Sequence, residues 1–68
     1  MEDLKKFNIL LEDGSLIKEC NVFSNFGHAR NVRDIKNALR KESRIVVNNE
    51  FIKREVINAR NVYEVEII

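Results

Sequence analysis

Cationic residues cluster in one part of a chain whose net charge is only +1. Arg33, Lys36 and Arg40 are spaced i, i+3 and i+7, which puts them on one side of a helix where they can contact one anionic surface together. Residues 28–44 carry six Lys or Arg and two acidic residues, or +4, whereas the other residues carry six basic and nine acidic groups, or −3. The sequence therefore predicts an anion-binding surface made of Arg30, Arg33, Lys36, Arg40 and Lys41.

The element that must position these cations is a helix over Asn31 to Lys41. Asn31 is a favourable N-cap, and Asp34 follows three positions later, near the positive end of the helix dipole. Four apolar residues share the face opposite the cations and should pack on the core: Val32, Ile35, Ala38 and Leu39.

Two kinds of macromolecule would suit such a surface. An acidic protein is one, and nucleic acid is the other; three to five phosphate contacts would give a salt slope of about −3 to −4.5 on duplex DNA. The sequence has no helix-turn-helix partner for this helix and no basic stripe interleaved with aromatic residues, so residues that read bases are not identified. A third hypothesis is a small phosphorylated ligand at an oligomer interface, with Arg30 or His28 as the anion contact.

Catalytic arrangements are weakly represented. Ser24 and His28 are close in sequence but lack the motif of a serine hydrolase, and Glu64 with Glu66 resembles a solvated strand face more than an acid–base pair. The two glycines are isolated, so no phosphate-binding loop exists. We therefore expect a protein that is not an enzyme and has no cofactor.

The size of the chain leaves little margin for stability. Sixty-eight residues form one small domain, residues 1–68, at a length where burial and chain entropy nearly cancel. With a single cysteine, Cys20, and a single histidine, neither a disulfide nor a metal site can be built within one chain. Self-association is therefore expected. The absence of a membrane-length apolar run or a signal-like N-terminus predicts a cytoplasmic protein with no membrane partner.

A β-hairpin is predicted from Phe7 to Phe23, closed by a two-residue turn at Asp13 and Gly14. That register puts Leu11 opposite Leu16 and Phe7 opposite Cys20 on the core face. The outer face would then carry two apolar pairs that need cover, from barrel curling or from a second subunit. These pairs are the predicted self-association residues: Leu4, Leu10, Ile17 and Phe23.

The remaining segments complete an order ββαβββ. Residues 24–30 read as a surface loop with Phe26 under the helix, and Arg44 to Val47 as a strand with Ile45 and Val47 inward. Residues 50–60 fit a bulged strand or a helix, with a strand favoured, and the chain ends in a half-exposed strand. The expected class is α+β: a small antiparallel sheet or a partly open SH3-like or Sm-like barrel with one short helix.

These features favour a non-enzymatic protein-interaction module, self-associating and acting as a regulator or inhibitor of a larger protein. The alternative is a nucleic-acid-binding module whose basic helix contacts phosphates. An excess of Asn, Ile, Lys and Glu, with no Pro or Trp, suggests an AT-rich coding genome, bacterial, phage or mobile-element in origin.

Overall fold

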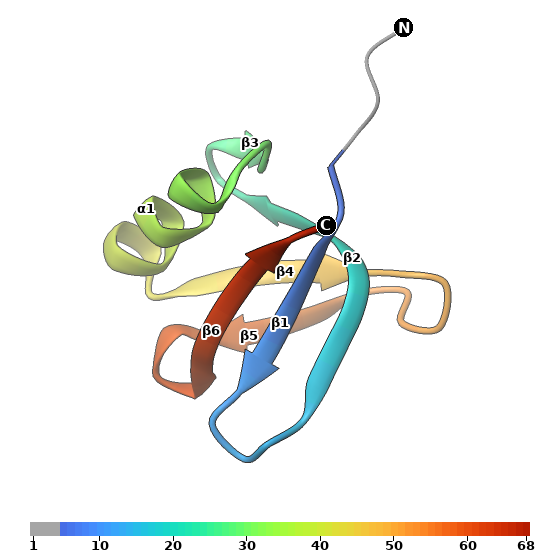
Figure 1. Ribbon diagram of the computed structural model, residues 1–68. Helices are drawn as coiled ribbons and strands as arrows, with labels where there is room; N and C mark the ends of the chain where they lie inside the picture. The colour runs from blue at the N-terminus through green and yellow to red at the C-terminus, as the bar shows by residue number, and fades with distance from the viewer. Residues whose placement is uncertain (1–4) are drawn as a thin grey trace, which may run out of the picture.

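The computed structural model describes residues 5–68, which form a small α+β domain with one α-helix and a six-stranded antiparallel sheet that is not closed (Figure 1). A short 3-10 helix, η1, precedes the last strand. In chain order the elements are β1 (Phe7–Leu11), β2 (Leu16–Ser24), β3 (Gly27–His28), α1 (Val32–Glu42), β4 (Arg44–Asn48), β5 (Glu55–Asn58), η1 (Ala59–Asn61) and β6 (Val62–Ile67).

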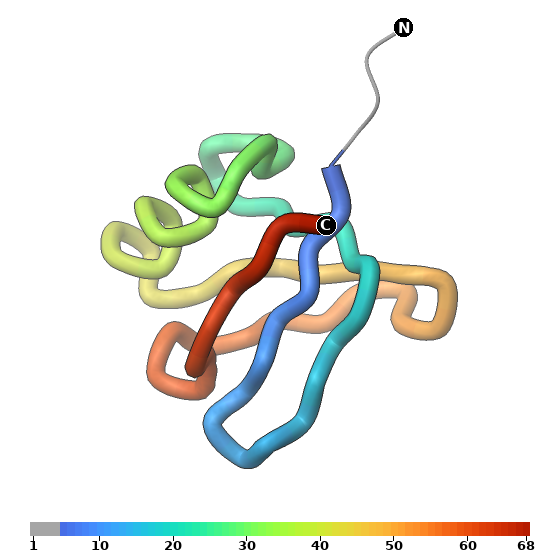
Figure 2. Tube along the Cα trace, in the orientation of Figure 1, coloured from blue at the N-terminus to red at the C-terminus, as the bar shows by residue number. Residues whose placement is uncertain are grey.

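The long strand β2 belongs to both halves of the sheet. Its first part pairs with β1, and its second part, from Asn21 onward, pairs with β4, while its end also pairs with β3. Because β3 lies in residues 24–30, which the sequence predicted as a loop, the expected order ββαβββ was wrong by this one short strand. Within residues 5–68 the strand order is β5-β4-β2-β1-β6, so β5 and β6 are the edge strands at its two ends, while the short β3 lies off this path and pairs with β2. Because the chain bends along β2, the β4–β5 pair crosses behind β1 and β6, and α1 lies over one end of the space between them (Figure 2).

The turn of the β1–β2 hairpin is one residue longer than the sequence predicts. The Leu11 N–H donates to the Ser15 carbonyl at 2.8 Å, which leaves three residues in the loop, and Gly14 adopts a φ of 93°. The Ser15 N–H donates to the Asp13 carboxylate at 2.8 Å and fixes this turn. A three-residue loop with glycine in the left-handed region is a common hairpin closure. The expected two-residue turn was therefore wrong, and so was the expected pairing of Leu11 with Leu16, because Leu16 lies opposite Leu10 and is exposed.

A β-bulge in β2 then restores the predicted pairing farther along. Ile9 pairs with Ile17, whereas Phe7 pairs with Cys20, so one extra residue is present in β2 between these two pairs. Glu19 takes a φ of 49°, and its N–H donates to the Asn8 side chain at 3.0 Å. Ile17 and Cys20 consequently both face the core. The expected outer position of Ile17 was wrong, because the sequence pattern alone revealed neither the longer turn nor the bulge.

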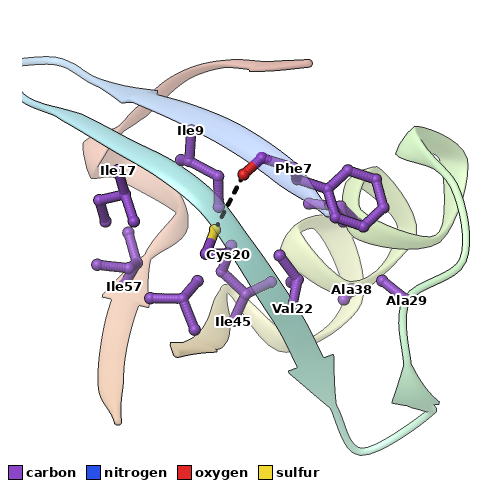
Figure 3. Packing of buried hydrophobic residues seen from close by; sticks show 11 residues of the cluster. Phe7, Ile9, Ile17, Cys20, Val22, Ala29, Ala38, Ile45 and Ile57 are labelled. Atoms are coloured by element: carbon purple, nitrogen blue, oxygen red, sulfur yellow. Dashed lines mark hydrogen bonds between the residues drawn. The ribbon is translucent and has the colours of Figure 1, made fainter. Parts of the chain in front are cut away.

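The hydrophobic core lies between the two halves of the sheet and α1 (Figure 3). Phe7 and Ile9 come from β1, and Ile45 and Val47 from β4, and all four are fully buried. The inward position of the two β4 residues was predicted correctly. The remaining buried members are Ile17, Cys20, Val22, Ala29, Ile35, Ala38 and Ile57.

The segment from residue 50 to residue 60 contains a strand only in its second half. Before the strand, the Asn49 side chain accepts from the N–H groups of Phe51 and Ile52 at 2.8 and 2.7 Å and donates to the Lys18 carbonyl at 3.0 Å. This asparagine anchors a tight loop to β2, and the strand β5 starts after it. The expected strand is thus confirmed in part, and the final strand β6 is confirmed as half-exposed.

Candidate functional site: a cationic helix face and an adjoining sheet groove

Both ends of α1 are defined by hydrogen bonds, as the sequence predicts for its start. The Asn31 side chain accepts from the Asp34 N–H at 2.9 Å, and the Asp34 carboxylate accepts from the Arg30 N–H at 2.9 Å. At the other end Ser43 adopts a φ of 63°, and its N–H donates to the Leu39 carbonyl at 3.0 Å. The Asn31 side chain satisfies one of the backbone donors that the helix leaves free, and the Asp34 carboxylate holds the backbone just before the cap. The helix position is therefore well determined.

The apolar face of α1 packs against the core through Ile35 and Ala38, and this directs the cations to solvent. All five cations that the sequence predicts are exposed: Arg30, Arg33, Lys36, Arg40 and Lys41. Arg40 donates to the Asn37 side chain at 3.1 Å, and within residues 5–68 neither Arg33, Lys36 nor Arg40 forms an ion pair with a carboxylate. Their charge is thus not neutralised by the described part of the chain.

The loop between β2 and β3 is tied to the last turn of α1. The Asn25 N–H donates to both Glu42 carboxylate oxygens, at 3.1 and 3.2 Å. Phe26 is 63% exposed, and the Lys41 ammonium lies 5.8 Å from its ring centroid, within the range of a cation–π contact. The expected position of Phe26 under the helix was wrong, because this tether holds the loop beside the helix terminus and leaves the ring in solvent.

Beside this loop lies a groove on the outer face of the β2-β4-β5 half of the sheet. Its volume is about 550 Å³. The strand pairing aligns Phe23, Val46 and Val56 in one row across the three strands, and this row forms an apolar floor. Three exposed cations also line the groove, Arg44, Lys53 and Arg54.

The sequence pattern did not predict this groove. Its cations lie in two separate segments, and only the pairing of β4 with β5 brings them to one face. Glu42 is the one carboxylate among the groove residues, and its oxygens already accept from the Asn25 N–H. The groove therefore presents a cationic rim to an incoming ligand.

A smaller cavity lies near the start of α1, where the third hypothesis places a small phosphorylated ligand. His28 and Arg30 both line it, as that hypothesis requires, but the Asp34 carboxylate lines it too. The ring centroids of His28 and Phe23 lie 4.5 Å apart, and the buried Nε2 atom of His28 has no hydrogen-bond partner among residues 5–68. This cavity has one carboxylate and one arginine in its lining, whereas the groove has one carboxylate and three cations, so the cavity suits a phosphorylated ligand less well than the groove does.

The four predicted self-association residues lie in different environments. Leu4 lies outside the described residues. Leu10 is half-buried on the outer face opposite Leu16, Ile17 is in the core, and Phe23 is in the groove floor. The structure does not bring them together into one surface.

Chemically reactive groups do not converge in the described part of the chain. Residues 5–68 contain no group of three His, Cys, Asp or Glu side chains placed to hold a metal ion. Cys20 is buried, and its Sγ donates to the Phe7 carbonyl at 3.3 Å; burial raises the pKa of this thiol to about 11. The Ser24 hydroxyl accepts from the Phe26 N–H at 3.0 Å and forms no bond with His28.

Comparison with known proteins found no matching family model, no matching curated protein and no matching solved structure. Within residues 5–68, no helix combines the length and the apolar character needed to span a bilayer.

Proposed function

We propose that this protein is a non-enzymatic interaction module that binds an anionic macromolecule, and that it regulates or inhibits a larger protein by binding an acidic part of its surface. The observation that supports this proposal is the cationic face of α1. Arg33, Lys36 and Arg40 project from a well-capped helix and have no carboxylate partner within residues 5–68. Because these cations form no internal ion pairs in the described part of the chain, binding an anionic partner breaks none there, and their positive potential favours fast association.

The test is a comparison of two charge-reversed variants that carry the same net charge. Arg33→Glu/Lys36→Glu/Arg40→Glu reverses the helix face, whereas Lys5→Glu/Lys6→Glu/Lys18→Glu reverses three exposed lysines elsewhere. Nuclease-treated extract of the native host is passed over each immobilised protein and over the wild type. We expect a partner to be retained by the wild type and by the lysine variant but not by the helix variant. Equal retention by all three proteins would contradict the proposal.

A second candidate is nucleic-acid binding, which the groove specifically favours. An apolar floor with Phe23 can receive bases, and Arg44, Lys53 and Arg54 can contact phosphates at the same time. Three phosphate contacts on a single strand would give a salt slope of about −2. Titration of labelled oligonucleotides at two salt concentrations, with Arg44→Ser/Lys53→Ser/Arg54→Ser as the comparison, measures this slope. Binding that is absent, or that is unchanged by salt and by the variant, contradicts this candidate.

The proposal extends to architecture and assembly. We propose an SH3-like or Sm-like relationship for the sheet, supported by the bend along β2 and by the two layers that this strand joins. Self-association remains part of the proposed function, with Leu10 and Phe23 as its surface residues. Sedimentation equilibrium at micromolar concentration tests it, and a strictly monomeric species would remove this part of the proposal.

A further inference from the structure

The open side of β6 offers backbone groups that the described part of the chain does not use. β6 pairs only with β1 and ends the strand order. The Ile68 N–H donates to the Lys6 carbonyl at 3.1 Å. In an antiparallel ladder alternate residues point the same way, so Glu64 and Glu66 direct their N–H and C=O groups to β1, and Val65 directs its groups to the open side. Such an edge is a template for another strand.

The side chains along β6 define the chemistry that would fit there. Glu64 and Glu66 are exposed, and they lie opposite Leu10 and Asn8 on the outer face of the sheet. Val65 lies on the other face, where it packs against the core. Residues directly opposite each other on paired strands interact, and opposite charges there are favourable. The partner strand should therefore carry cations at alternate positions, facing the two glutamates, and apolar residues between them.

A second copy of β6 does not meet this requirement. When two copies of β6 pair as antiparallel strands about a two-fold axis, residues whose backbone groups face the open side pair with each other, so each glutamate lies opposite an even-numbered residue of the second copy. Along β6 these residues are Val62, Glu64 and Glu66, and none of them is a cation in any register. With Val65 opposite Val65 of the second copy, Glu64 of each copy faces Glu66 of the other, which opposes two pairs of like charges. Like charges directly opposite on neighbouring strands are destabilising. Charge complementarity thus selects a foreign strand over self-pairing.

We propose that β6 binds an extended segment of another protein in which Lys or Arg alternates with apolar residues, by adding that segment as a further strand next to β6. This site uses the backbone of β6 with Glu64 and Glu66, and none of the cations of α1 or of the groove, so it goes beyond the function proposed above. The backbone hydrogen bonds supply affinity, and the two glutamates select a cationic partner over an acidic one.

The test uses labelled peptides of alternating Lys and Val and measures their binding by fluorescence anisotropy. The unmodified peptide should bind, and a peptide of alternating Glu and Val should not. Two N-methylated forms, one methylated at every Lys amide and one at every Val amide, keep all charges but each removes one set of donors. We expect only one of the two to lose binding, because only alternate amides face β6. Equal binding by both forms would overturn the proposal.

Protein variants supply the matched controls. Glu64→Gln/Glu66→Gln should weaken binding about tenfold, as expected for the loss of two cross-strand pairs. Glu12→Gln/Glu50→Gln removes two exposed carboxylates elsewhere and should leave binding unchanged. Hydrogen exchange at the Val65 amide should slow when the Lys-Val peptide is present. If this amide is already protected in a wild-type dimer, a second copy occupies the edge and the proposal is overturned.

Discussion

The two edge strands of the sheet occupy equivalent positions but carry opposite chemistry. β5 follows Lys53 and Arg54, and its Val56 faces the cationic groove; Glu55 lies on the other face, opposite the buried Val47. β6 presents Glu64 and Glu66 on its outer face. In the described part of the chain, each of these strands pairs with one neighbouring strand. The two strands therefore differ in local charge: three cations line the groove beside β5, whereas two carboxylates lie along β6.

This difference shows how little the net charge of +1 says about the surface. A nearly neutral chain can separate its charges, so that one edge strand lies among cations and the other carries carboxylates. Local potential, and not net charge, then decides which partners approach which part of the molecule. β2 lies between β4 and β1 in the strand order, so it joins the half of the sheet that ends in β5 to the half that ends in β6. The position of each edge strand therefore depends on how β2 packs in the core.

The largest expected effect comes from Ile17, whose burial depends on the longer turn and on the bulge in β2. Ile17→Ala should lower the free energy of unfolding by about 2–4 kcal/mol, because it leaves a cavity in the core. Leu16→Ala, at a neighbouring residue that is 47% exposed, should cost less than about 1 kcal/mol. Urea denaturation measures both. The reverse order would mean that β2 has the register first predicted from its sequence.

That register illustrates what the sequence could and could not predict. The helix, its Asn31 cap and its exposed cations follow from local periodicity and capping, and these were predicted correctly. The bulge at Glu19 depends on a hydrogen bond to Asn8, eleven residues away, so no local pattern reveals it. The groove depends on the pairing of β2, β4 and β5, which brings Phe23 beside Val46 and Val56.

A smaller effect is expected at the cap of α1, the helix that contacts both β4 and β6. Asn31→Ala removes the acceptor for the Asp34 N–H and should lower the free energy of unfolding by about 1 kcal/mol. Asn31→Ser keeps a capping oxygen and should recover most of that loss. Thermal unfolding of the three proteins measures the difference. If the alanine and serine variants were equally stable, the side-chain cap would contribute nothing, and packing alone would hold the helix between the two halves of the sheet.

An effect confined to high pH is expected at Cys20, which lies immediately after the bulge in β2. Burial raises the pKa of its thiol from an ordinary value near 9 to about 11. Between these values the unfolded chain releases a proton that the native state keeps, so the free energy of unfolding falls as pH rises from about 9 toward 11, and this contribution is constant below 9. Cys20→Ala removes this contribution and leaves every other titratable group in place. Urea denaturation of both proteins across this range should therefore show a steeper decline for the wild type. Parallel curves would mean that the thiol reaches solvent in the native state, and that the strand joining the two edges is less firmly packed than the core geometry implies.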